Sequence, residues 1–99
     1  MAKGYLIAHV KVTNEAAFKE HYSAKVVEVL SQYGGKFLVV TDQALHHEGR
    51  PCDRHVVVEF DSLAAAETAI QSKEYLALKA HRVNNSDIDY GSFMLVPGV

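Results

Sequence analysis

Two histidines and a glutamate lie in segments whose residues alternate in polarity. His9 falls within residues 4–12 (GYLIAHVKV), and His55 and Glu59 fall within residues 54–60 (RHVVVEF). Strand alternation puts these three side chains on one sheet face when the two strands are neighbours. A histidine held by a carboxylate can act as a general base, so His9, His55 and Glu59 are the candidate catalytic residues. The competing interpretation, which the sequence favours, is a polar cluster that fixes the register of an interface.

A second group of potential ligands gathers between the two middle strands. It comprises His46, His47, Glu48, Cys52, Asp53 and His55. Imidazole, thiolate and carboxylate suit zinc or another transition metal, and the spacing Cys52-x-x-His55 is compatible with ligation. The second pair of ligands typical of a structural zinc site is missing, so an exposed polar hairpin without metal is the favoured interpretation. Cys52 as a nucleophile has no identifiable base.

Four strands and two helical regions are expected to position these residues. The strands are predicted at 4–12, 36–41, 54–60 and 90–96. A helix is predicted over 15–33, because apolar residues recur there at steps of three and four, and Gly34-Gly35 ends it. Ser62 can cap a short helix that reaches Ile70, Ser72 can start another turn or two, and residues 83–89 read as a loop.

The order of these elements is βαββαβ, which is typical of an α+β, ferredoxin-like domain spanning residues 1–99. Connection handedness predicts a four-stranded antiparallel sheet in the spatial order 4-1-3-2, with both helices on one face. The other face carries Tyr5, Ile7 and Val57. A contiguous apolar patch of this kind is rarely left in contact with water. We therefore expect a homodimer in which two such faces pack together about a two-fold axis.

Composition excludes several classes of partner. The formal net charge is −2, without basic runs, which argues against nucleic-acid or membrane-surface binding. No stretch approaches the 18 apolar residues of a membrane span. The single cysteine excludes an internal disulfide, and no signal-peptide pattern is recognisable, so a cytoplasmic location is expected.

A set of motifs in order along the chain carries a family resemblance. The motifs are GYLIAHV at 4–10, YGGKFL at 33–38, EG at 48–49, RHVVVEFDSL at 54–63 and SKEY at 72–75. Together they resemble the DUF1330 family, which implies the fold of the dimeric α+β barrel superfamily. The resemblance implies no reaction, because that superfamily includes cofactor-independent monooxygenases, haem-degrading enzymes, dye-type peroxidases, isomerases and non-catalytic binders.

The chain also departs from the family pattern. Ala69 and Ile70 stand where relatives commonly carry a Trp-Tyr pair, and Ser72-Lys73-Glu74-Tyr75 lacks the usual proline. If those aromatics wall a pocket in relatives, the pocket here has another shape. The haem-degrading enzymes use an asparagine on the first strand and a tryptophan, both missing here, and His81 is the only tolerable axial ligand. No cofactor is therefore expected.

The resemblance also implies a ligand pocket between the sheet and the helices. Tyrosines on the helices, Tyr22 among them, can reach such a cleft, and arginine suits an anionic group. The candidate ligand-binding residues are Tyr33, Arg54, Tyr75, His81 and Arg82. The alternative is that these tyrosines form the edge of the core and the charges are solvated.

Three functions follow from these observations. The first is binding of a small organic ligand between sheet and helices. The second is a cofactor-independent enzyme, resembling a monooxygenase or an isomerase, that uses a histidine base. The third is a structural or stress-related dimer without catalysis. An enclosed pocket with a histidine near its floor would favour the enzyme.

Overall fold

The alternating segments of the sequence form a four-stranded antiparallel sheet in the computed structural model, which describes residues 2–99. The strands are β1 (Gly4–Val10), β2 (Lys36–Thr41), β3 (Arg54–Phe60) and β4 (Ser92–Pro97). Their spatial order is β2-β3-β1-β4. This order confirms the predicted ferredoxin-like arrangement.

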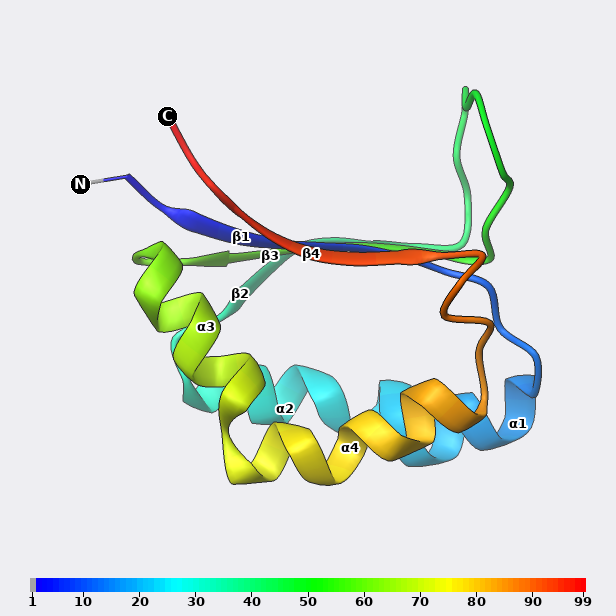
Figure 1. The fold of residues 1–99 in the computed structure, drawn as a ribbon, viewed down its shortest axis with the longest axis horizontal. Helices are drawn as coiled ribbons and strands as arrows, with labels where there is room; N and C mark the ends of the chain where they lie inside the picture. Colours follow the sequence, from blue (N-terminus) through cyan, green and yellow to red (C-terminus); the bar gives the residue numbers. More distant parts are fainter. Residues whose placement is uncertain (1) are drawn as a thin grey trace.

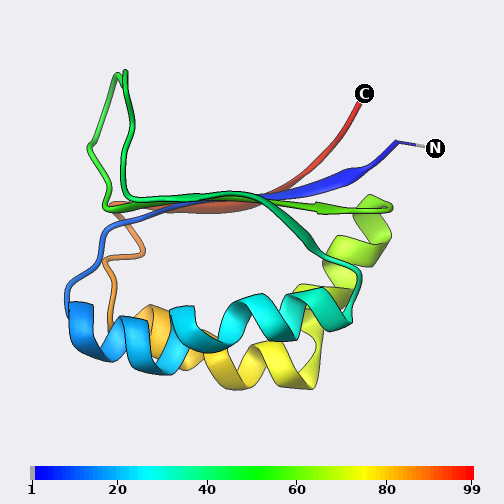
Figure 2. The same ribbon diagram turned by 180° about the vertical axis from the view of Figure 1, so that it is seen from behind.

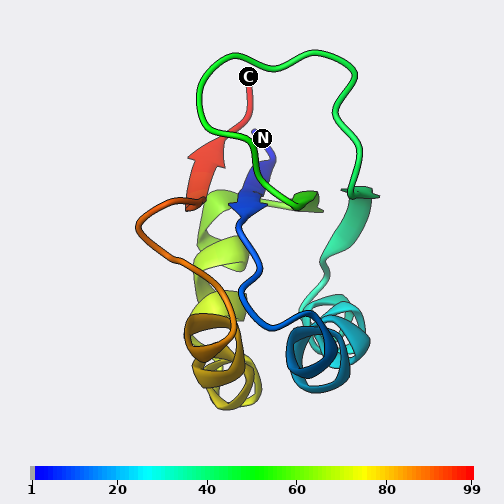
Figure 3. The ribbon, with the colours of Figure 1, turned by 90° about the vertical axis from the view of Figure 1, so that its right-hand side faces the viewer.

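The helical segments pack on one face of the sheet and leave the other face open (Figures 1 and 2). They are α1 (Glu15–Phe18), the π-helical turn η1 (Lys19–Ser23), α2 (Ala24–Gln32), α3 (Leu63–Gln71) and α4 (Lys73–Asn84). The loop over residues 42–53 rises on the opposite side, above the open face (Figure 3). In the chain from residue 2 onward, no helix has the length and apolar character needed to cross a bilayer.

The predicted helix over residues 15–33 forms, but its middle winds more loosely than expected. Asn14 caps its first turn by accepting a hydrogen bond from the Ala17 N–H, and Gly34, with φ of 85°, ends it as predicted. Between α1 and α2, η1 has π-helical rather than α-helical hydrogen bonding. Such turns are frequent at functional sites, and η1 contains Tyr22.

The second helical region is longer than predicted. Ser72 breaks it into α3 and α4, because its hydroxyl accepts from the Tyr75 N–H and donates to the Ala69 carbonyl. α4 then runs to Asn84, where only one or two turns were expected, so the predicted loop over 83–89 starts after Asn84. Arg82 in these extra turns contacts the Phe93 ring, and the Asn85 and Ser86 side chains donate to the carbonyls of His81 and Arg82, which stabilises the end of α4.

Two strand ends differ from the predictions. β1 ends at Val10 instead of residue 12, since the Val12 N–H donates to the Asp53 carboxylate and not to a neighbouring strand of the sheet. The last strand spans Ser92–Pro97 instead of 90–96. There the Tyr90 N–H donates to the Asp87 side chain, which holds Tyr90 in a turn.

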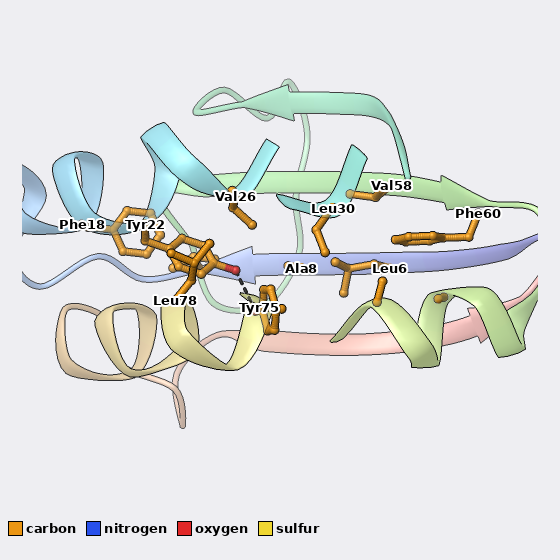
Figure 4. Packing of buried hydrophobic residues seen from close by; sticks show 13 residues of the cluster. Leu6, Ala8, Phe18, Tyr22, Val26, Leu30, Val58, Phe60, Tyr75 and Leu78 are labelled. Atoms are coloured by element: carbon orange, nitrogen blue, oxygen red, sulfur yellow. Dashed lines mark hydrogen bonds between the residues drawn. The ribbon is translucent and has the colours of Figure 1, made fainter. Parts of the chain in front are cut away.

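The core lies between the helices and the inward face of the sheet (Figure 4). Leu6 and Ala8 of β1 and Val58 and Phe60 of β3 point toward the helices and are almost fully buried. Because alternate residues of a strand face opposite sides, Tyr5, Ile7 and Val57 point to the open face. The predicted division of the two strands is therefore confirmed.

Candidate functional site

An apolar pocket lies between the sheet and the first helical region. Its volume is about 140 Å3. Exposed side chains of α2 and β2, Val27 and Val40, contribute to its wall and mark the side that is open to solvent. The remaining lining residues are Leu6, Ala8, Val10, Phe18, Tyr22, Ser23, Val26, Leu30, Phe37, Arg54, Val56, Arg82 and Phe93. The lining combines a mostly hydrocarbon surface with a few polar groups, as ligand sites usually do.

A chain of hydrogen bonds runs beside this pocket. The hydroxyl oxygens of Tyr22 and Tyr75 are 2.8 Å apart (Figure 4), and the Arg82 Nε–H donates to the Tyr75 hydroxyl over 3.2 Å. When Tyr75 in turn donates to Tyr22, the Tyr22 hydroxyl hydrogen is free for a ligand. Burial, and then the neighbouring Tyr75, raises the pKa of Tyr22 well above its ordinary 10.0. Tyr22 is therefore a neutral donor at physiological pH.

Arg82 is a cation that contacts both this chain of hydrogen bonds and the pocket. Its guanidinium carbon lies 4.2 Å from the centroid of the Phe93 ring, in cation–π geometry. Within residues 2–99, none of the ion pairs gives Arg82 a carboxylate partner. A half-buried guanidinium without a counter-ion attracts an anionic ligand more strongly than one that is already paired.

The charge of Arg54, the second predicted cation of the pocket, is balanced by a carboxylate. Its guanidinium forms an ion pair with Glu15 and also donates to the Asp53 carbonyl. Arg54 lines the pocket as predicted, but its charge is already shared with a carboxylate at the start of α1. It is therefore less available than Arg82 to bind an anion.

Three of the predicted ligand-binding residues, Tyr33, Tyr75 and His81, lie outside the pocket lining. Tyr75 is fully buried behind the pocket and is linked to it through its hydrogen bonds with Tyr22 and Arg82. The Tyr33 hydroxyl, at the end of α2, donates to Glu74 over 2.8 Å, and this bond raises the pKa of Tyr33 and lowers that of Glu74. The His81 ring stacks on His21, with ring centroids 5.0 Å apart. Both contacts link the two helical regions to each other.

The structure brings His9 and His55 together and leaves Glu59 apart from them. His9 and His55 are directly opposite in the β1–β3 pairing, and their Nδ1 atoms are 2.8 Å apart. Glu59 pairs across from Tyr5 instead and accepts its hydroxyl hydrogen over 3.1 Å, which raises the pKa of Tyr5. Within residues 2–99, no hydrogen bond joins Glu59 to either histidine, so the expected orienting contact is missing. The catalytic role of the three residues stays a prediction.

A second, more polar cleft opens where β1 ends and β4 begins. Its volume is about 310 Å3. Val10, Arg82 and Phe93 line both this cleft and the inner pocket, so they separate the two spaces. The other lining residues are His9, Lys79, Val83, Ser86, Asp87, Ile88, Gly91 and Ser92. His9 is thus the predicted catalytic residue that borders a cleft next to Arg82.

A family model described as a domain of unknown function (DUF1330) matches residues 3–99. The chain belongs to the DUF1330 family. Comparison with curated protein sequences gave no match.

Solved structures resemble this DUF1330 domain over nearly its whole length. The RPA0582 protein of unknown function from Rhodopseudomonas palustris has a TM-score of 0.75 at 15% identity, covering 99% of this chain and 83% of that one. SnoaB, a cofactor-independent oxygenase from Streptomyces nogalater, has a TM-score of 0.68 at 12% identity, covering 97% and 92%. A proposed antibiotic biosynthesis monooxygenase from Nitrosomonas europaea has a TM-score of 0.70 at 12% identity, covering 98% of this chain and 90% of that one. At such identities these likenesses establish the fold alone.

The predicted polar hairpin of the DUF1330 domain gathers no set of metal ligands. His46 bonds to Glu48 over 3.1 Å at the exposed loop, and Asp53 accepts from the Val12 N–H. Across residues 2–99, no three His, Cys, Asp or Glu side chains converge. Burial, and then the Asp53 carboxylate, raises the pKa of the Cys52 thiol, which disfavours the thiolate that a nucleophile requires.

Sequence reasoning missed Phe93, which stacks on Arg82 and lines both spaces. The signal was available, because alternation in the last strand puts Phe93 and Leu95 on the helix-covered face. Whether an aromatic pair walls a pocket in relatives, at the positions of Ala69 and Ile70, stays a prediction. Ala69 is in the core, and neither it nor Ile70 belongs to the lining of the inner pocket.

Proposed function

We propose that this DUF1330 domain binds a small organic acid in the pocket between its sheet and its helices. The observation that carries the proposal is the Arg82 guanidinium, which faces an apolar pocket and has no carboxylate partner within residues 2–99. An apolar cavity of about 150 Å3 is large enough for a benzene-sized molecule. The apolar body of the ligand would fill the pocket, and its carboxylate would face Arg82.

Tyr22 gives this pocket a neutral donor beside the cation. Tyr22 lines the pocket, and its hydroxyl is hydrogen-bonded to Tyr75, which in turn accepts a hydrogen bond from Arg82. A carboxylate that receives hydrogen bonds from both Arg82 and Tyr22 would be recognised by charge and by geometry. The mostly apolar surroundings strengthen both bonds, because the local dielectric constant there is lower than that of water.

Benzoate is a suitable probe, with benzyl alcohol as its uncharged counterpart. We expect benzoate to shift the amide NMR signals of residues around the pocket, and benzyl alcohol to bind more weakly. Arg82→Gln should weaken benzoate binding by about 10- to 100-fold, since a hydrogen bond to a charged group contributes about 1.5–3 kcal/mol. Titration by NMR measures both affinities.

Arg54→Gln is the matched control, because it removes a second arginine of the same lining whose charge is paired with Glu15. Its effect on benzoate should be smaller than that of Arg82→Gln. Equal affinity for benzoate and benzyl alcohol, or an Arg82→Gln variant that binds benzoate normally, would contradict the proposal.

We further propose that two copies of the chain associate through the open sheet face. The support is a row of apolar side chains across all four strands, made of Val39, Val57, Ile7 and Met94 in register. Val39 and Met94 are 39% and 43% exposed in the single chain. Sedimentation at micromolar concentration should give twice the chain mass, and a clean monomer would refute the association.

A further inference from the structure

Two histidines, His9 and His55, lie side by side on the open face of the sheet, in the row next to the apolar residues. His9 and His55 face each other across β1 and β3, with Nδ1 atoms 2.8 Å apart and rings inclined at 63°. In the single chain His9 is exposed and His55 is half-buried, so water and small ions can reach the rings there. Thr41 and Ser92 continue the same row on the outer strands.

The distance between the two nitrogens means that one ring carries a hydrogen on Nδ1 and the other offers a lone pair. We propose that this pair is a binding site for a divalent transition-metal ion of the copper or nickel kind. The metal takes the place of the shared hydrogen. The ring that loses its Nδ1 hydrogen takes one on Nε2 instead, so both neutral rings present Nδ1 and no net proton is released.

The distance between the two Nδ1 atoms favours one class of metal. With metal–nitrogen bonds of about 2.0–2.1 Å, two ligand nitrogens are roughly 2.9 Å apart at a right angle and roughly 3.4 Å apart at the tetrahedral angle. The hydrogen bond between His9 and His55 holds their Nδ1 atoms 2.8 Å apart, which is nearer to the right-angled spacing than to the tetrahedral one. Right-angled coordination by nitrogen and oxygen is characteristic of Cu²⁺ and Ni²⁺, whereas Zn²⁺ prefers the tetrahedron.

The protein supplies two ligands, and water supplies the others. No third His, Cys, Asp or Glu side chain joins the pair in the chain from residue 2 to 99. Since the strand pairing fixes both backbones, the two imidazoles act as a chelate whose geometry is largely set before the metal arrives. The Thr41 and Ser92 hydroxyls of the same row are suited to hydrogen-bond metal-bound water.

A second histidine pair in the same chain lacks this geometry. His21 and His81 stack with ring planes inclined at 26° and centroids 5.0 Å apart. Ring faces meet there, so the nitrogen lone pairs, which lie in the ring planes, do not point at a common position. The proposed site therefore depends on how two histidines face each other and not on their proximity alone. It rests on neither the organic-acid pocket nor the sheet-to-sheet dimer.

The test is a calorimetric titration of the untagged, metal-free full chain with Ni²⁺. We expect saturable binding at no more than one ion per chain. His9→Asn and His55→Asn should each weaken it by at least tenfold, and His21→Asn should leave it unchanged. Absence of binding to the native chain, binding that survives in both pair variants, or loss of binding in His21→Asn would overturn the proposal.

A second measurement on the native chain removes any dependence on how the variants fold. Substoichiometric Cu²⁺ is paramagnetic and broadens the NMR signals of nearby imidazole protons. The signals of His9 and His55 should broaden first, before those of His21, His46 and His81. Broadening that begins at the exposed hairpin histidines instead would place the metal elsewhere and refute the assignment.

Discussion

Val57 and Val58 are neighbours in one strand, yet they belong to two different environments. Val58 is fully buried against the helices, whereas Val57 faces the open side in a row of partly exposed apolar residues. The helices of the same chain cover Val58. Covering Val57 requires something beyond the described chain. The two faces of one sheet therefore separate folding from the proposed association, and neighbouring substitutions test the two independently.

The largest expected effect is that of Val58→Asp. This change places a carboxylate among the core residues of β1, β3 and α2 without a partner, which costs several kcal/mol. Because domains are stable by only about 5–15 kcal/mol, the variant should lose most of its fold. Far-UV circular dichroism and NMR signal dispersion measure the loss. A Val58→Asp variant with native spectra would contradict the assigned core.

Val57→Asp, one residue away, should have a different consequence. The carboxylate lies on the open face, where a single chain leaves it in contact with water, so the fold should persist. In a sheet-to-sheet dimer the same carboxylate would be buried, and association should weaken by several kcal/mol. Sedimentation equilibrium gives the dimer constant. The proposal fails if Val57→Asp associates as strongly as the native chain, or if it unfolds as Val58→Asp does.

On the covered face, Tyr22 should make stability depend on alkaline pH. Its folded-state pKa lies above the ordinary 10.0, chiefly through burial. Its contribution is therefore complete below pH 10 and is lost as the pH rises further, since the unfolded chain ionises first. Tyr22→Phe should cost about 1 kcal/mol at pH 8, and this difference should shrink by at most about 1.4 kcal/mol per pH unit above pH 10.

Urea unfolding of the two proteins between pH 8 and pH 11 measures that difference. The native chain contains five tyrosines, so the comparison with Tyr22→Phe is what isolates one of them. Tyr90→Phe, in the loop between α4 and β4, is the control. A stability difference for Tyr22→Phe that stays constant up to pH 11 would show that Tyr22 has the same pKa in the folded protein as in the unfolded chain, which contradicts the prediction.

The smallest effect is expected on the open face, at Tyr5. The hydrogen bond to Glu59 is the main reason why the pKa of Tyr5 is raised. Glu59→Ala removes the acceptor and its charge together, so the pKa of Tyr5 should fall toward 10.0 with little change in stability. NMR titration of the Tyr5 ring protons detects the shift. Lys36→Ala, which alters the other cross-strand neighbour of Glu59, serves as control.

The alternation of residues along the strands made the fold predictable, but it did not predict which side chains meet across neighbouring strands. It assigned the correct faces to β1 and β3 and, with connection handedness, the strand order. It also put His9, His55 and Glu59 on one face, but a shared face does not give distance along a strand. The antiparallel register, which pairs His9 with His55 and Tyr5 with Glu59, decides which side chains meet.

The site depended still more on contacts between distant segments. Arg54, Tyr75 and Arg82 could be proposed because of their residue types, but the Tyr22–Tyr75 bond joins residues 53 positions apart. No local pattern in Lys19–Ser23 signals a π-helical turn, and the last turns of α4 depend on the contact of Arg82 with Phe93 of another element. These features arise from packing, which a local pattern does not contain.

The π-helical turn η1 has a consequence for how this domain can change. A π-helical turn is equivalent to one residue inserted into an α-helix. Deleting a single residue from Lys19–Ser23 would restore an uninterrupted helix, leaving α2 and the sheet with the same partners, while turning Tyr22 away from Tyr75. The proposed binding pocket would thus be lost or regained through a one-residue change in chain length, without any alteration of the fold.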